Sequence, residues 1–235
     1  MAKIRQLLQA ALDVVMPRTC PVCGKALTAS EQWLCIGCLS DLPRTDLHSI
    51  DGNEMEQLFY GKTPAPIEHA SGFIWYEKGS NYSNIIHDIK YRHMPQMGQW
   101  LAAMAAKEMP ELMSGIDAVV PVPLHATKLA KRGYNQSDFI AQGVAQVSGA
   151  TVVHALKAIR SHSTQTHKSA LERWENIKGA YALVPGMERE LEGKHILIVD
   201  DVATTGSTLE ACVAQIQAVP QVKVSLFTLA VARLS

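Results

Sequence analysis

The chain has 235 residues, of which 47% are hydrophobic and 19% are charged. This is the composition of a globular protein, and the length suffices for one ordinary domain plus a smaller unit. Its 22 basic and 22 acidic residues cancel, which argues against strong stand-alone nucleic-acid binding, because nucleic-acid binders usually carry a basic excess.

The first segment, Met1–Met16, has apolar residues at helical spacing, interrupted by Lys3, Arg5 and Asp13. It lacks the continuous apolar core of a signal peptide, so we expect an amphipathic helix that docks on the body of the protein. Binding to a membrane surface is the alternative. No apolar run approaches the roughly 18 residues that a membrane span needs. We therefore expect a cytoplasmic protein with no membrane span.

Four of the five cysteines stand in two Cys-x-x-Cys pairs, Cys20 with Cys23 and Cys35 with Cys38. The two-residue gap lets a turn present both sulfurs to one ion, and four thiolates suit a closed, structural, tetrahedral zinc site. Disulfides are the alternative, which a chain without an export signal disfavours. The fifth, Cys212, lies among apolar residues at helical spacing, and we expect it to be a buried core thiol.

The domain organisation is predicted from changes in composition along the chain. Residues 1–44 are expected to form the helix and the zinc module, and residues 45–110 a linker and the elements of a cap. Within the second segment, Ser71–Tyr76 has the pattern of a strand, and residues 82–109 have a helical pattern with a break at Pro95.

Residues 111–235 alternate strand and helix patterns, as a parallel sheet requires. The predicted strands are Asp117–Val122, Thr151–Leu156, Ala180–Val184, His195–Val199 and Val222–Val231, and the predicted helices are Gln136–Val147 and Thr208–Val219. Continuous apolar strands indicate burial on both faces. The predicted fold class is therefore α/β, a Rossmann-like parallel sheet with helices on both faces, plus a small zinc-ribbon-like N-terminal module.

The strand at His195–Val199 ends in two carboxylates, Asp200 and Asp201, before a loop of small residues and a helix. The loop residues are Ala203, Thr204, Thr205, Gly206, Ser207 and Thr208. Small side chains let backbone amides approach an anion, and the helix N-terminus adds further N–H donors, which together make a monophosphate cradle. The paired acids would accept hydrogen bonds from the vicinal hydroxyls of a ribose. An ordinary capped helix is the alternative, and it explains the hydroxyls but not the acids.

Residues Ile196–Thr208 resemble the phosphoribosyl-diphosphate (PRPP) motif of type I phosphoribosyltransferases. The segments Val120–Gln136 and Arg160–Tyr181, together with the cysteine pairs, are similar to the competence-protein ComF family. Members of that family are linked to natural transformation and to the use of extracellular DNA as a nutrient. The resemblance covers almost the whole chain, is nearest to the DNA-utilisation branch, and implies a type I phosphoribosyltransferase-like fold.

The resemblance implies roles for the residues of the strand, loop and helix. Asp200 and Asp201 would hold the ribose hydroxyls of PRPP, and the loop 203–208 would hold its 5′-phosphate. Magnesium is expected on the oxygens of the ligand and on water, not in a protein cage.

Further residues are implied as contacts of the pyrophosphate. Leu124 and His125 would face it, with Lys128 and Arg132 as candidate counter-charges. The polar loop 160–178 would close over the ligand, and its Arg160 and Arg173 are candidates to neutralise the leaving group, because a guanidinium matches phosphate oxygens. The alternative for each of these arginines is a solvated charge.

Two classes of function remain open. The first is an enzyme of the phosphoribosyltransferase type, transferring a pentosyl group to nucleobases or related products from DNA. The second is a non-catalytic PRPP-sensing or adaptor protein of the DNA-uptake machinery, acting through contacts with proteins or single-stranded DNA. The expected partners are PRPP or a phosphoribosylated small molecule, and competence proteins. No purine or pyrimidine pattern is recognisable around Phe73–Tyr76 or His87–His93.

Overall fold

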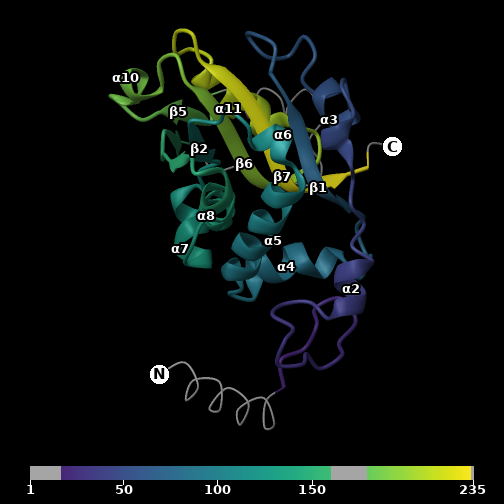
Figure 1. The fold of residues 1–235 in the computed structure, drawn as a ribbon. Coiled ribbons are helices and arrows are strands. Elements are labelled where there is room, and N and C mark those ends of the chain that lie inside the picture. The colour runs from purple at the N-terminus through teal and green to yellow at the C-terminus, as the bar shows by residue number, and fades with distance from the viewer. Residues whose placement is uncertain (1–16, 160–178, 234–235) are drawn as a thin grey trace.

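A computed structural model describes residues 17–159 and 179–233 of the chain. The helix expected at residues 1–16, and the loop that carries Arg160 and Arg173, lie outside these ranges. Five parallel strands form a central sheet in the order β1-β7-β6-β2-β3 (Figure 1). Among the described residues, none of the helices has the length and apolarity needed to cross a lipid bilayer.

The central sheet is built from buried, mostly apolar strands. Its members are β1 (Ala70–Tyr76), β2 (Ala118–Pro121), β3 (Thr151–Val152), β6 (His195–Ala203) and β7 (Lys223–Ala232). Ile198 of β6 lies opposite Val120 on one side and Leu226 on the other. Two further strands, β4 (Leu156–Ala158) and β5 (Tyr181–Leu183), form a separate antiparallel pair.

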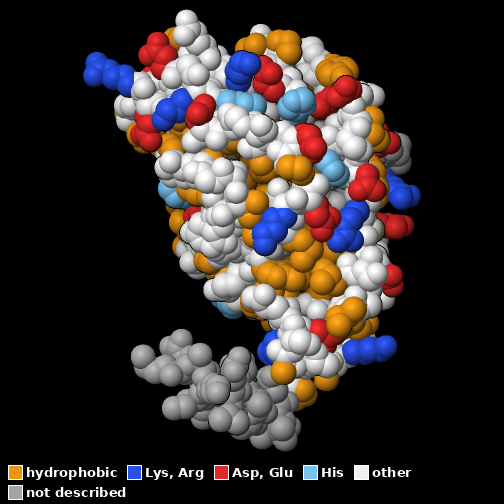
Figure 2. Space-filling view, viewed as in Figure 1, with side chains coloured by type: hydrophobic (Ala, Val, Ile, Leu, Met, Phe, Trp, Pro, Cys, Tyr) orange, Lys and Arg blue, Asp and Glu red, His pale blue; other side chains and the backbone are white. Residues whose placement is uncertain are grey.

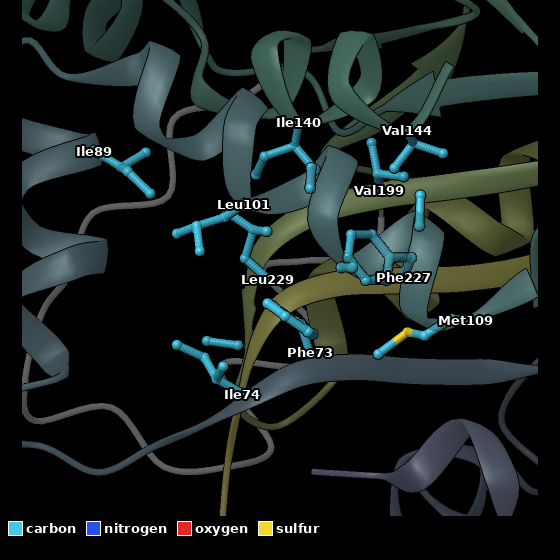
Figure 3. Close-up of a cluster of buried hydrophobic side chains, with 14 of the residues drawn as sticks. Phe73, Ile74, Ile89, Leu101, Met109, Ile140, Val144, Val199, Phe227 and Leu229 are labelled. Carbon is cyan, nitrogen blue, oxygen red and sulfur yellow. The ribbon is translucent and has the colours of Figure 1, made fainter. Parts of the chain in front are cut away.

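Helices cover both faces of the sheet, which confirms the predicted α/β fold class. Leu197 and Val199 of β6 face a core formed with α4 (Ser83–Tyr91), α5 (Pro95–Glu108) and α8 (Gln136–Ser148) (Figure 3). The intervening residues Ile196 and Ile198 face a second core with α3 (Glu54–Gln57) and α11 (Ser207–Ile216). The shorter helices are α2 (Ile36–Ser40), η1 (Leu47–Ser49), α6 (Pro110–Met113), α7 (Ala126–Arg132) and α10 (Met187–Leu191).

The strand at Ser71–Tyr76, expected in a cap, is instead the edge of the central sheet. Gly72 permits this pairing, because a Cβ at that position would lie 2.1 Å from the Val231 side chain of β7. The outer edge of β1 is covered by the preceding chain: the Thr45 amide donates to the Phe73 carbonyl at 3.1 Å. The segment expected as a linker therefore packs along the sheet.

Two predicted strands differ in extent from the structure. Thr151–Leu156 is divided, because β3 pairs with β2 over two residues only and the chain then leaves the sheet to pair with β5 as β4. The strand predicted to end at Val199 continues to Ala203, because β7 remains paired with it over that length. Both aspartates therefore belong to the strand.

Figure 2 shows lysine, arginine, aspartate and glutamate side chains interspersed over one face of the molecule. This mixing agrees with the zero formal charge of the whole chain. It gives that face no strong field of either sign to attract a polyanion.

The contact between α5 and α8 depends on a glycine. A Cβ at Gly143 would lie 2.2 Å from the carbonyl oxygen of Gln99. We expect Gly143→Ala to lower the free energy of unfolding by about 1–3 kcal/mol, because the two helices must separate. Gly98→Ala is the matched control: its Cβ would meet Ile89 at an ordinary 3.4 Å, and alanine favours a helix by up to about 1 kcal/mol. Urea unfolding followed by circular dichroism compares them, and equal stabilities would contradict the packing.

Candidate functional site

Asp200 and Asp201, hereafter the acid pair, lie at the carboxyl end of β6 and are 9% and 3% exposed. The carboxyl ends of parallel strands are where open α/β sheets bind ligands. The Oδ1 atom of Asp200 accepts hydrogen bonds from the Ser137 hydroxyl at 3.0 Å and from the Asp201 amide at 2.8 Å. Ser137 stands in the first turn of α8, so two elements hold this carboxylate in place.

The second carboxylate is held by a lysine from another part of the chain. The Nζ atom of Lys90, near the end of α4, lies 2.7 Å from Oδ1 of Asp201. The other oxygen, Oδ2, is buried and has no hydrogen-bond partner among the described residues. A buried acceptor without a donor costs free energy, and native proteins rarely leave one. Oδ2 of Asp201 is therefore an acceptor that still lacks a donor in the described part of the chain.

Burial and mutual repulsion set the protonation of these groups. Burial raises the pKa of Asp200, and the charge of Asp201 raises it further, against the opposing effects of the Asp201 amide, Lys90 and Ser137. Burial lowers the pKa of Lys90, but the neighbouring carboxylates outweigh burial and leave that pKa above its usual value. The lysine is thus held as a cation beside the acids.

The loop after β6 leads directly into α11, as the sequence predicts. Gly206 adopts a φ of 76°, in the left-handed region that glycine favours, and no side chain caps the helix. Thr204 and Thr205 are exposed, and Ser207 and Thr208 are half-buried. The hydroxyls of Thr205 and Ser207 lie 2.9 Å apart. The N-cap residue Gly206 offers no side-chain acceptor to the first N–H groups of α11, and such groups are suited to an anion.

An aromatic ring that the sequence pattern does not predict supports this loop. A Cβ at Gly206 would lie 3.2 Å from Cζ of Phe59, which is 2% exposed. Phe59 follows α3, far from the loop in sequence, so no local pattern connects the two. Any larger residue at position 206 would meet this ring as well as the unfavourable φ.

The loop after β2 opens at the same edge of the sheet, because β2 pairs with β6 up to Val199. Leu124 and His125 are half-buried, and the His125 ring caps α7 by accepting from the Thr127 amide at 3.3 Å. Lys128 is exposed. The structure therefore brings this loop beside the acid pair.

Arg132, in the last turn of α7, is already engaged. Its guanidinium donates to the Gln136 side chain and lies 5.3 Å from the centre of the Tyr91 ring. Tyr91 directly follows Lys90 on α4, so this stacking links α7 to the helix that carries the lysine. Arg160 and Arg173 lie outside the described residues, and the structure does not place them.

The two cysteine pairs converge on one point. The sulfurs of Cys20, Cys23, Cys35 and Cys38 all lie within 4.8 Å of one another, and none is in a disulfide. Burial raises the pKa of Cys20, but the amides of Cys35, Cys23 and Val22 outweigh it and lower the pKa to about 7. Four thiols so placed could hold a metal ion, and soft metal ions prefer such ligands. Cys212 is buried in the second core, as predicted.

The cysteine module packs against the start of α4. The Tyr82 hydroxyl donates to the Cys38 carbonyl at 3.2 Å, and the Asn84 side chain donates to the Pro21 carbonyl at 3.1 Å. Cys20 and Ile85 belong to the same buried apolar cluster. One helix thus contacts the metal site at its first turn and the acid pair at its last (Figure 1).

A cavity of about 560 Å³ lies elsewhere, toward the amino end of β1, with His48, Glu56 and Ser71 in its lining. It includes none of the loop residues 203–208 and neither member of the acid pair. We place the functional site by the chemistry of its groups, because a hollow alone does not identify the reacting atoms.

The sequence is similar to those of known proteins. A family model described as "Phosphoribosyl transferase domain" matches residues 91–232. "DNA utilization protein YhgH" of Escherichia coli (strain K12) is 30% identical over 196 residues, which cover 81% of this chain and 80% of that protein. The protein of the same name from Salmonella typhi is 36% identical over 133 residues, covering 54% of this chain and 57% of its own length. "Competence protein F" of Haemophilus influenzae is 34% identical over 111 residues, covering 47% and 48%.

The raised pKa of Asp200 has a consequence for stability. A carboxyl with a raised pKa holds its proton more tightly in the folded state, so stability falls as the pH rises above the usual aspartate value of about 4. We expect Asp200→Asn, which keeps the shape and removes the titration, to gain stability relative to the wild type as the pH rises. Unfolding in urea from pH 4 to pH 8 measures this, with exposed Asp51→Asn as the control. Parallel curves for Asp200→Asn and the wild type would contradict the burial of a charged Asp200.

Proposed function

Because the chain belongs to the phosphoribosyl transferase domain family, we propose that it binds PRPP or ribose 5-phosphate at the carboxyl end of β6. We further propose a role in the use of extracellular DNA as a nutrient or in DNA uptake, which the names of its relatives support. The observation that carries the binding proposal is the buried, unpartnered Oδ2 of Asp201 beside the uncapped start of α11.

In the proposed complex, the acid pair accepts hydrogen bonds from the two ribose hydroxyls. A neutral diol suits this position better than a second phosphate, which the carboxylates would repel. The amides and hydroxyls of residues 203–208 bind the 5′-phosphate at the start of α11. Both groups belong to one strand, loop and helix, so the spacing between phosphate and diol is set by a short stretch of chain.

The pyrophosphate is proposed to lie over Leu124 and His125, with Lys128 as the exposed counter-charge. Arg132 contributes only after it leaves its contacts with Gln136 and Tyr91. Arg160 and Arg173 remain candidates to neutralise the leaving group. Magnesium would be held by the oxygens of the ligand and by water, and would offset their charge.

The proposed activity is transfer of the phosphoribosyl group to a nucleophile. The bond between C1 of the ribose and the pyrophosphate oxygen breaks, and pyrophosphate leaves with the electron pair as the nucleophile bonds to C1. The chain's own part is to position the sugar through its diol and its phosphate. A non-catalytic sensor or adaptor is the second candidate, favoured by relatives that are named for a process and not for a reaction.

For the four cysteines we propose a structural Zn²⁺ site, because four thiolates close the tetrahedral shell and leave no position for substrate. We also propose that the protein acts in the cytoplasm, where thiols stay reduced and free to bind metal.

The binding proposal is tested with Asp200→Asn combined with Asp201→Asn. We expect PRPP affinity in the presence of magnesium to fall by about 100-fold, since two hydrogen bonds to charged groups contribute about 3 kcal/mol together. Titration calorimetry measures the loss, and circular dichroism verifies folding. Asp51→Asn, outside the site, should bind as the wild type does. Unchanged affinity in the double variant would end the assignment.

Enzyme and sensor are separated by incubating the wild type with PRPP, magnesium and a panel of nucleobases while following pyrophosphate. We expect steady release with at least one base. Tight binding of PRPP with no release by any base would favour the sensor or adaptor.

For the metal, we expect about one zinc ion per purified chain by elemental analysis, as four thiolates bind one ion. Cys23→Ser should lose the metal and unfold more readily, whereas Cys212→Ala, which alters the cysteine of the second core, should retain it. A stably folded wild type that purifies without metal would refute the site.

A further inference from the structure

Lys90 is fixed in position before any ligand arrives. Its helix, α4, buries Ile85, Ile86 and Ile89 against the first core, and the Tyr134 hydroxyl donates to the Ile89 carbonyl. The Lys90 side chain is 23% exposed, far less than a solvated lysine on a helix surface. The 2.7 Å contact with Asp201 is therefore a built feature of the fold and not a chance pairing of mobile surface groups.

The charges around the acid pair do not balance without this lysine. Both carboxylates are buried, and Lys90 is the cation among the main influences on the pKa of Asp200. Ser137 of α8 and Lys90 of α4 contact the pair, Tyr181 of β5 and Cys212 of α11 lie close enough to interact electrostatically with Asp200, and Tyr91 of α4 interacts with Lys90. Apart from Lys90, these groups are neutral near pH 7 in their usual states.

Ionisation of the pair matters because a carboxylate only accepts hydrogen bonds, whereas a carboxylic acid also donates one. Two buried carboxylates side by side tend to share a proton, since like charges in a desolvated site disfavour double ionisation. A proton retained on either carboxylate would remove an acceptor that a diol needs. A fixed cation opposes that retention.

We propose that Lys90 is the internal counter-cation of the acid pair, opposing the retention of a proton in the ligand-free protein so that the carboxylates can accept hydroxyl groups. The ligand in this inference, a sugar phosphate with a vicinal diol, rests on the proposed function. The effect on the carboxylates does not. Lys90 is thus a positioning residue that sets the pH range in which the site binds.

A merely structural ion pair would alter stability and leave the pH range of binding unchanged. The decisive variant is Lys90→Met, which keeps the unbranched shape and most of the length of the side chain and removes its charge. Lys90→Arg retains a cation, and Lys107→Met removes an exposed lysine from α5 as the matched control. Lys90→Gln, which keeps a hydrogen-bond donor without charge, is the second variant should Lys90→Met fail to fold. Circular dichroism checks each protein.

Two measurements are made on every variant. The first follows the carboxyl-carbon NMR signals of Asp200 and Asp201 without ligand from pH 3 to pH 9. The second measures PRPP binding with magnesium by calorimetry at pH 7 and pH 9. For Lys90→Met we expect the titration of the pair to move up by about one pH unit, which corresponds to binding weaker by up to about tenfold at pH 7. The deficit should shrink at pH 9, and Lys90→Arg and Lys107→Met should resemble the wild type.

The NMR titration tests the role of Lys90, and the calorimetry tests the proposed binding of PRPP. A pair that titrates in Lys90→Met and Lys90→Gln as in the wild type overturns the role of Lys90, whatever happens to PRPP. A wild type that does not bind PRPP overturns the proposed function, while an upward shift of the titration still supports the counter-cation.

Discussion

The burial of two adjacent carboxylates at the end of a central strand is the constraint on which the rest of this structure depends. Removing like charges from water is costly unless hydrogen bonds and a counter-charge compensate. Here the compensation comes from three directions: the Ser137 hydroxyl on α8, the strand's own amide at Asp201, and Lys90 on α4. The packing of α4 and α8 on the sheet is therefore part of the site and not only its scaffold.

That packing explains why α5 is so tightly placed. It packs against two neighbouring helices, with α8 against the backbone of Gln99 through Gly143 and α4 against Gly98 through Ile89. Side chains from these helices meet those of β6 and β7 in one continuous core (Figure 3). A close-packed interior resists small displacements. The positions of Ser137 and Lys90 relative to the acid pair are therefore held firmly.

The strand, loop and helix around the acid pair could be predicted because they are local: apolar residues, two acids, small residues and a helix follow one another within His195–Ile216. The cysteine cluster was predictable for the same reason. Lys90 could not be found this way. It lies 111 residues before its partner in a helix whose pattern suits an ordinary solvated lysine, and only the tertiary fold turns it inward. The pairing of β1 was missed likewise, because strand order is not written in the periodicity of one strand.

The nine residues of α4 join two kinds of chemistry. At about 1.5 Å per residue the helix is about 14 Å long. Beside its first turn, Tyr82 and Asn84 donate hydrogen bonds to backbone carbonyls of the cysteine module. Near its last turn, Lys90 binds the carboxylate of Asp201. A helix this short bends little between its two ends. The cysteine module therefore fixes the position at which α4 begins, and with it the position of the Lys90 ammonium group.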